Sequence, residues 1–244
     1  MVEPLFKFEL PMKAGETVLL QGEEGHHAAS VRRMRVGEAI ALTNGATHAR
    51  GLVTAVAAKS VEVKLESVTE LAPPSTRFTL VQALAKGDRD ELAVQAATEL
   101  GVLGVIPWQS ERSVSRWEGP KVAKSVARWQ SISEEASKQS LRPLFAQVHN
   151  PVSSKELAKQ ISDSNGQWLV LDPTASQSIV SVSAADGSDF FLIVGAEGGI
   201  TEHELQLFEA AGAKRVHLGE GILRTSTAGM AALAFLAGKF GLWG

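Results

Sequence analysis

The stretch FFLIVGAEGGITEHEL, residues 190–205, carries the strongest structural signal in this 244-residue chain. Residues 190–194 are uniformly apolar and have the length of a buried strand. Residues 195–199 form a glycine-rich loop, and Thr201 with Glu204 three positions later is a capping box at a helix start. Strand, glycine loop and helix in this order offer backbone N–H groups and a helix N-terminus to a ligand.

Glu197 restricts what this loop can bind. A carboxylate repels phosphate but suits a hydroxyl, an amine or a cationic ligand. The glycine spacing differs from the dinucleotide-binding fingerprint, and no Walker-type lysine follows. A surface turn with an exposed glutamate is the alternative interpretation.

A similar segment, HLGEGILRTST at residues 217–227, follows one strand–helix unit later. Here a strand (214–218) enters a glycine-containing loop and then a helix capped by Thr or Ser. Two such loops at the carboxyl ends of neighbouring parallel strands predict a ligand crevice, with Arg224 placed to hold a polar substrate. Paired helix caps with no ligand are the alternative for either loop alone.

Strands alternate with helices throughout the segment around these loops, which predicts an α/β domain with a mainly parallel sheet. We expect strands at 78–83, 102–107, 167–171, 190–194 and 214–218, and helices at 88–100, 121–139, 154–161, 201–211 and 225–240.

The segment before residue 71 has a different pattern. Short alternating runs at 16–21, 38–43, 48–57 and 61–67 predict strands of a small barrel, with one helix at 23–34. Asn44-Gly45 predicts a tight turn between two of them. Adjacent prolines at 73 and 74 mark a linker. We therefore expect two domains, 1–72 and 73–244.

Composition excludes several classes of function. The chain has no cysteine, which excludes disulfides, thiolate metal sites and cysteine nucleophiles. Its six histidines lack ligand spacing, so no metal is expected. Neither a long apolar run nor a signal-peptide pattern is present, which predicts a cytoplasmic protein without a membrane partner.

The net charge of −3 conceals an uneven distribution. Residues 73–150 carry 10 Lys or Arg against 8 Asp or Glu, whereas residues 151–244 carry 6 against 10. Basic residues concentrate at 32–35 and at 112–142, which are the expected phosphate contacts for RNA. The candidates are Arg32, Arg33, Arg35, Arg112, Arg116 and Arg142. A solvated basic helix face is the alternative for the longer stretch.

These motifs together resemble a known family. HAASVRRMRVG (27–37), ATELGV (97–102), SERS (110–113), Arg128-Trp129 with EEASKQS (134–140), and both glycine loops are similar to the RsmE-type enzymes. These are 16S ribosomal RNA uracil-N3 methyltransferases of the SPOUT superfamily. The resemblance runs nearly end to end.

The resemblance implies an RNA-binding, PUA-like β-barrel (1–72), then a SPOUT α/β domain (73–244) with a deep trefoil knot, in a homodimer. It implies S-adenosylmethionine as methyl donor and 16S rRNA or the small ribosomal subunit as partner. The implied cofactor contacts are Leu171, Gly195, Glu197, Gly198, Leu218, Gly219, Ile222, Leu223 and Arg224. Glycine there would let backbone approach the cofactor without a Cβ between them.

Four positions depart from the common family pattern. Ala196 stands where Pro is usual, Glu220-Gly221 where Pro-Arg is usual, and Ser226 where many members have Glu. One arginine of the usual pair is therefore missing.

As catalytic residues we expect Arg224, stabilising negative charge on a uracil carbonyl oxygen, and Glu197, accepting a hydrogen bond from cofactor or base. Two alternatives remain open from sequence: a SPOUT methyltransferase for another RNA site, and a non-catalytic RNA-binding or ribosome-assembly protein of the same fold.

Overall fold

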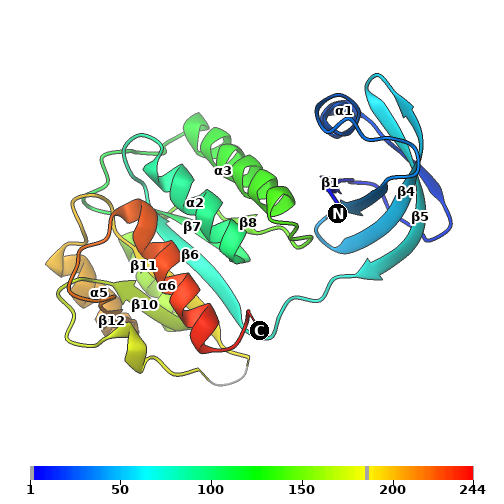
Figure 1. Ribbon diagram of the computed structural model, residues 1–244. Helices are drawn as coiled ribbons and strands as arrows, with labels where there is room; N and C mark the ends of the chain where they lie inside the picture. Colours follow the sequence, from blue (N-terminus) through cyan, green and yellow to red (C-terminus); the bar gives the residue numbers. More distant parts are fainter. Residues whose placement is uncertain (1–2, 185–186, 244) are drawn as a thin grey trace. The chain divides into compact units, whose positions relative to one another are not determined.

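The computed structural model describes residues 3–184 and 187–243, which divide into two compact units (Figure 1). One unit contains the chain up to Pro73 together with Ser137–Phe145, and the other contains Pro74–Ala136 and the chain from Ala146 onward. Residues 71–74, at the adjacent prolines, carry no regular structure. The segment Ser137–Phe145 belongs to the first unit, although it follows the proline linker in sequence and lies within the range 73–244 expected for the second domain.

The first unit, in its described part, is built on a five-stranded sheet of order β1-β3-β4-β5-β2. β1 runs parallel to β3, and the remaining pairs are antiparallel. The predicted turn at Asn44-Gly45 is confirmed: Asn44 Oδ1 accepts the N–H groups of Ala46 (3.0 Å) and Thr47 (2.8 Å). The strands are β1 (Leu5–Lys7), β2 (Thr17–Leu20), β3 (Ala39–Thr43), β4 (Thr47–Ala57) and β5 (Ser60–Glu70).

The helix predicted at 23–34 is shorter than expected. It consists of α1 (Gly22–His26) and a π-helical turn η1 (His27–Val31), and the Arg32 N–H donates to the His27 carbonyl at 2.9 Å. Arg33 then takes a left-handed conformation with φ of 55°, which ends the helix. The arginines at 32, 33 and 35 therefore lie on an exposed irregular segment.

The second unit confirms the predicted α/β fold with a parallel sheet. Its strands follow the order β12-β10-β11-β6-β7-β8, and β9 also pairs with β7. The strands are β6 (Arg77–Ala83), β7 (Gly104–Gln109), β8 (Gln147–Val148), β9 (Val152–Ser153), β10 (Gln167–Leu171), β11 (Asp189–Val194) and β12 (Lys214–Val216). The helices are α2 (Arg89–Leu100), α3 (Pro120–Gln139), α4 (Ser154–Asp163), α5 (Glu202–Ala211) and α6 (Thr225–Lys239), with a short 3₁₀ turn η2 (Ile179–Ser181).

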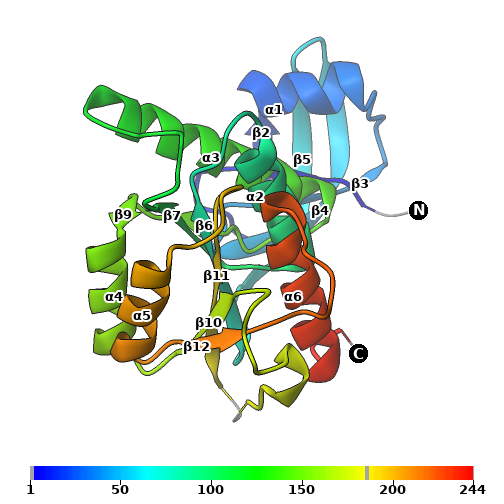
Figure 2. The same ribbon diagram turned by 90° about the vertical axis from the view of Figure 1, so that its left-hand side faces the viewer.

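Helices cover both faces of this sheet, with α4 and α5 on one side and α2 and α6 on the other (Figure 2). On the α6 face, Phe190 stacks between Phe78 and Phe240 at 5.3 and 5.2 Å. On the opposite face Trp108 meets Phe208 edge-on at 5.3 Å. Fully burying each such ring contributes about 1.5–3 kcal/mol, so both faces are firmly packed.

The two glycine loops do not follow neighbouring strands, which corrects the sequence-based expectation. They follow β11 and β12, and β10 lies between these two strands. Strand neighbours are set by long-range pairing that local sequence does not encode. As a result, the segment that follows β10 contributes to the ligand crevice between the loops.

Candidate active site

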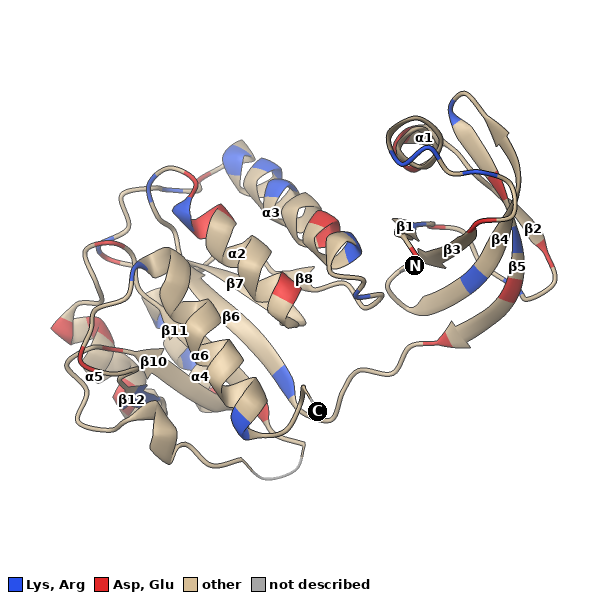
Figure 3. Ribbon diagram, viewed as in Figure 1, with Lys and Arg blue, Asp and Glu red and all other residues tan. Residues whose placement is uncertain are grey.

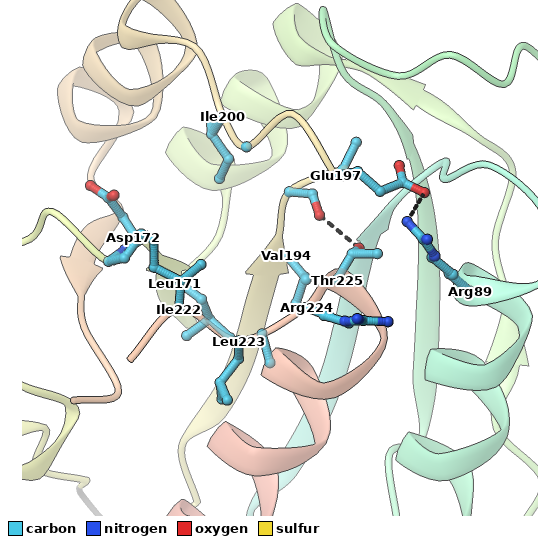
Figure 4. A pocket seen from close by; sticks show the side chains of 15 residues that line it. Arg89, Leu171, Asp172, Val194, Glu197, Ile200, Ile222, Leu223, Arg224 and Thr225 are labelled. Carbon is cyan, nitrogen blue, oxygen red and sulfur yellow. Dashed lines mark hydrogen bonds and ion pairs between the residues drawn. The ribbon is translucent and has the colours of Figure 1, made fainter. Parts of the chain in front are cut away.

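A cavity of about 420 Å³ opens at the carboxyl ends of β10 and β11, beside the amino end of α6 (Figure 4). This is the edge of a parallel sheet at which α/β proteins bind ligands. Its lining consists of Arg89; Leu171, Asp172 and Pro173; Val194, Gly195, Ala196, Glu197, Gly199 and Ile200; and Ile222, Leu223, Arg224, Thr225 and Ala228.

The structure brings most of the predicted cofactor contacts to this cavity. Leu171, Gly195, Glu197, Ile222, Leu223 and Arg224 line it. Leu218 lines an adjoining hollow of about 50 Å³ that shares several of these residues. Gly198 and Gly219 line neither space. Gly198 instead packs against Arg112, because a Cβ placed on Gly198 would lie 3.3 Å from Arg112 Cβ.

Glu197 connects the first glycine loop to the segment between β6 and α2. Its Oε1 accepts the Lys86 N–H at 3.0 Å and lies 3.2 Å from an Arg89 guanidinium nitrogen. A carboxylate has about four acceptor positions, so further donors can still reach it. The contact with Glu197 holds the Arg89 side chain at the edge of the cavity, where Figure 4 shows it beside Glu197.

Arg224 is fixed through its backbone and open at its side chain. As N-cap of α6, its carbonyl accepts the N–H groups of Thr227 (2.9 Å) and Ala228 (3.0 Å). The side chain is exposed, and within the described residues its guanidinium has no hydrogen-bond partner. Five N–H donors are therefore available at the cavity edge.

A buried hydrogen-bond chain, which the sequence did not reveal, forms the floor of the cavity. Thr225 Oγ1 donates to the Gly195 carbonyl at 2.7 Å and accepts from Gln82 Nε2 at 2.8 Å. Gln82 is fully buried at the end of β6, and its Oε1 has no partner among the described atoms. The chain joins β6, the first glycine loop and the start of α6, so these three elements hold the floor rigid.

Asp172, also missed from sequence, lies on the cavity wall directly after β10. Its carboxylate accepts from the Thr174 N–H at 3.0 Å and from Arg215 Nε at 2.8 Å. Burial by itself would raise its pKa, but the hydrogen bonds from Thr174 and Arg215 outweigh it and hold the pKa below the ordinary aspartate value. A polar residue following a buried parallel strand was the signal available in the sequence.

The first glycine loop is also braced from its far side. The Glu111 N–H donates to Glu204 Oε1 at 2.8 Å, and Ser154 Oγ donates to the same oxygen at 2.7 Å. The Glu111 carboxylate accepts the Thr201 hydroxyl at 2.7 Å, which together with His203 lowers the pKa of Glu111. The predicted capping box of Thr201 and Glu204 is confirmed, so the loop enters α5 through a fixed turn.

The predicted RNA-contact arginines fall into one group in each unit. Arg32, Arg33 and Arg35 are exposed in the first unit, where Arg142 is half-buried and has its pKa lowered by burial. In the second unit Arg112 and Arg116 are exposed after β7, and Arg112 donates to the Gly198 carbonyl at 2.5 Å.

The long basic stretch is not uniformly available. Lys138 is buried against Glu24, and Arg128 is paired with Glu91. Exposed lysines remain on the first turns of α3, which Figure 3 shows as a basic end of that helix.

In the described residues no cluster of three or more His, Asp or Glu side chains has the geometry of a metal site. None of the helices within residues 3–184 and 187–243 is both long and apolar enough to cross a membrane.

Two family models match this sequence. Residues 72–237 match an RNA methyltransferase domain, and residues 20–66 match an RNA methyltransferase PUA domain.

Curated relatives agree with these matches. The ribosomal RNA small subunit methyltransferase E of Mycobacterium bovis is 36% identical over 237 residues, covering 96% of this chain and 90% of the relative. The protein of the same name from Bacillus subtilis is 30% identical and covers 91% of this chain and 90% of the relative.

Solved structures show the same architecture along the whole chain. A Legionella pneumophila putative methyltransferase with bound cofactor SAM has a TM-score of 0.87 at 28% identity, with 98% of both chains covered. The Neisseria gonorrhoeae ribosomal RNA small subunit methyltransferase E bound to S-adenosyl methionine has a TM-score of 0.85 at 28% identity, also covering 98% of each chain.

Proposed function

The chain belongs to the ribosomal RNA small subunit methyltransferase E family, and we propose that it methylates N3 of one uridine in 16S rRNA. It is an S-adenosylmethionine-dependent RNA methyltransferase with a PUA-like domain. The observation that carries the proposal is an unpartnered arginine, Arg224, at the edge of a cavity that suits this methyl donor.

The lining of the cavity fits S-adenosylmethionine. Leu171, Val194 and Leu223 give it apolar walls suited to an adenine ring, and the carboxylates of Asp172 and Glu197 suit a ligand with cationic groups. Its volume of about 420 Å³ is in the range of small-molecule sites. When bound, S-adenosylmethionine supplies a methyl group that is already strongly electrophilic.

The protein's contribution is then to position the base and stabilise its anion. Uracil N3 is a poor nucleophile until it loses its proton, and the resulting negative charge is delocalised onto the ring carbonyl oxygens. Arg224 stabilises that charge at one carbonyl oxygen. Glu197 holds Arg89 and the β6–α2 segment in place and accepts a hydrogen bond from cofactor or base.

RNA recognition is divided between the units in this proposal. The first unit closes as a PUA-like barrel and contacts RNA through Arg32, Arg33, Arg35 and Arg142, while Arg112 and Arg116 contact RNA next to the cavity. Exposed arginines on irregular segments suit phosphate contacts because they can follow an RNA backbone. The substrate is ribosomal, so the proposal includes a cytoplasmic location.

The proposal also includes a trefoil knot around residues 217–224 and a homodimer. Supporting the knot, β12 is an edge strand next to β10, yet α6 returns to pack on β6 and β11. Supporting the dimer, Ile222 is 81% exposed and Leu223 43% exposed at the cavity, which is unusual for large apolar side chains unless a second copy covers them.

The decisive experiment uses small ribosomal subunits from a strain that lacks this gene. They are incubated with the purified protein and S-adenosylmethionine, and modified nucleotides in 16S rRNA are mapped by mass spectrometry. We expect N3-methyluridine at a single position. A methyl group on a different atom or no incorporation would reject the proposal.

A further inference from the structure

A second cavity, of about 360 Å³, lies in the same unit on the other side of the segment between β6 and α2. It shares no lining residue with the first. Arg89, the first residue of α2, lines the first cavity, and Lys86 and Gly87 of the preceding segment line the second. The backbone of Lys86 also bonds to Glu197, so the two cavities are held in fixed register.

One wall of this second cavity is aromatic. Trp117 and Trp129 meet edge-to-face, with ring centroids 4.8 Å apart, and both are more than nine-tenths buried. The backbone N–H of Trp117 also donates to Gln109 Oε1 at 3.2 Å. The two indoles are therefore rigid, and the small part of them that lines the cavity offers apolar contact to a bound base.

The rim is basic. Lys86 and Lys121 come from different elements, are exposed, and have no acceptor for their ammonium groups among the described residues. Arg128 also reaches the cavity but is already paired with Glu91. Two available cations above an apolar wall are the combination that binds the phosphate and the base of one nucleotide.

The interior carries an acceptor. Asp90, 5% exposed, accepts the Ala85 N–H at 3.0 Å and the Glu91 N–H at 2.9 Å, one on each oxygen. Each carboxylate oxygen has a second acceptor position. An acidic side chain can accept a hydrogen bond from an exocyclic amino group, as it does from N4 of cytosine, and uracil has no such group.

We propose that this second cavity binds the base of a nucleotide flanking the target uridine, with its phosphate between Lys86 and Lys121 and an exocyclic amino group directed at Asp90. The inference rests on the proposed function, because the target uridine must lie at the edge of the first cavity, beside Arg224 and next to the methyl donor that this cavity would hold. A polymeric substrate held at two adjacent cavities has its reacting base fixed in orientation as well as position.

Matched substitutions on α3 test the basic rim and the volume of the cavity. Lys121→Glu reverses a lining charge, whereas Lys124→Glu reverses an exposed charge on the same helix outside the cavity. Ser125→Phe fills the cavity, whereas the exposed Ser131→Phe does not. For both cavity variants we expect the KM for small subunits to rise about tenfold or more, with S-adenosylmethionine affinity unchanged. Equal effects of Lys121→Glu and Lys124→Glu would overturn the inference.

Cross-linking identifies the occupant. Val114 lines the rim and is 73% exposed, so Val114→p-benzoylphenylalanine places a photoreactive group there. We expect cross-links in small subunits to map within a few nucleotides of the methylated uridine, and none there from Ser131→p-benzoylphenylalanine. Cross-links only to distant RNA or to a ribosomal protein would overturn the inference. Methylation by the wild-type protein tests the proposed function separately. If the wild type methylates the small subunit but the cross-links lie elsewhere, the proposed function stands and only the inference about the second cavity fails. If the wild type methylates nothing, the proposed function fails, and the cross-link positions still show what the second cavity binds.

Discussion

The two glycine-rich loops of the second unit look alike in sequence but differ in how the protein holds them. The loop at residues 195–199 is bonded on both sides, through Glu197 to Lys86 and Arg89 and through Gly198 to Arg112. The loop at residues 217–224 leaves Ile222 81% exposed and the Arg224 guanidinium without a partner among the described residues. The first loop is therefore fixed by hydrogen bonds to other segments, whereas the second exposes an apolar side chain and a guanidinium that can contact a ligand.

The sharpest test of this contrast is Arg224→Ala, because Arg224 is the available donor of the open loop. We expect methyl transfer to fall by about 10²–10³ or more, as when a donor to a developing anion is removed. Thermal stability should be unchanged, since the side chain is exposed. S-adenosylmethionine affinity should also be unchanged, because we expect residue 224 to contact the cofactor through its backbone and the base through its side chain. Single-turnover assays and calorimetry measure both, with Lys214→Ala on the exposed β12 edge as control. Retained turnover would contradict the assignment.

A pair of glycine substitutions compares the loops directly. A Cβ on Gly195 would lie 2.7 Å from Ile200 Cγ1 and 3.2 Å from the Gly199 backbone, whereas one on Gly221 would meet no atom of the described residues within 4 Å. We expect Gly195→Ala to cost about 1–3 kcal/mol of unfolding free energy through overpacking. Gly221→Ala should change it by less than about 0.5 kcal/mol. Urea denaturation measures both, and equal effects would mean that the loops are held alike.

Thr225→Val tests the floor beneath the clamped loop. The change keeps the shape but leaves the Gly195 carbonyl and Gln82 Nε2 each without one partner, for an expected cost of about 1–2 kcal/mol. Thr227→Val is the control, because Thr227 Oγ1 makes only a 3.2 Å bond to the Arg224 carbonyl. We also expect weaker S-adenosylmethionine binding for Thr225→Val alone. If denaturation curves and cofactor titrations do not separate the two variants, the floor is not rigid in the way described.

Asp172, which directly follows the strand between the loops, should give the smallest effect and a pH dependence. Its pKa is held below the ordinary 3.8, so the ionised carboxylate stabilises the fold above that value and the contribution disappears as pH falls through the folded pKa. Asp172→Asn should lower the free energy of unfolding by about 1 kcal/mol at pH 7. The difference in unfolding free energy between the variant and the wild type should become smaller at acidic pH. Denaturation as a function of pH measures this, with exposed Asp163→Asn as control. A gap that is constant with pH would exclude the ionic origin.

Local patterns predicted most elements because those patterns reflect burial and capping. Residues 190–194 are apolar because β11 is buried between two helical layers, and Thr201 with Glu204 forms the cap that its spacing predicts. The helix predicted at 23–34 was too long because Arg33 adopts a left-handed conformation that no local signal marks. β1 was not predicted, because its three residues are too few to show the alternation of apolar and polar side chains that distinguishes a strand from a loop.

The candidate site was predicted only in part. Arg224, Glu197 and the glycines were visible because they stand in loops after strands. Gln82 and Asp172 were not, because their roles depend on partners at Thr225 and Arg215, far away in sequence.

The amino-acid sequence alone was sufficient to determine the alternation of strands and helices in the second unit and a family resemblance that the comparisons confirm. Tertiary structure was needed to establish that β10 lies between the strands leading into the loops, that residues 137–145 pack with the first unit, and that one loop is clamped while the other is open. The physical reason is that propensity, periodicity and capping act over a few residues. Strand order and hydrogen-bond partners arise from contacts between segments that can be more than 100 residues apart, such as Lys86 and Glu197.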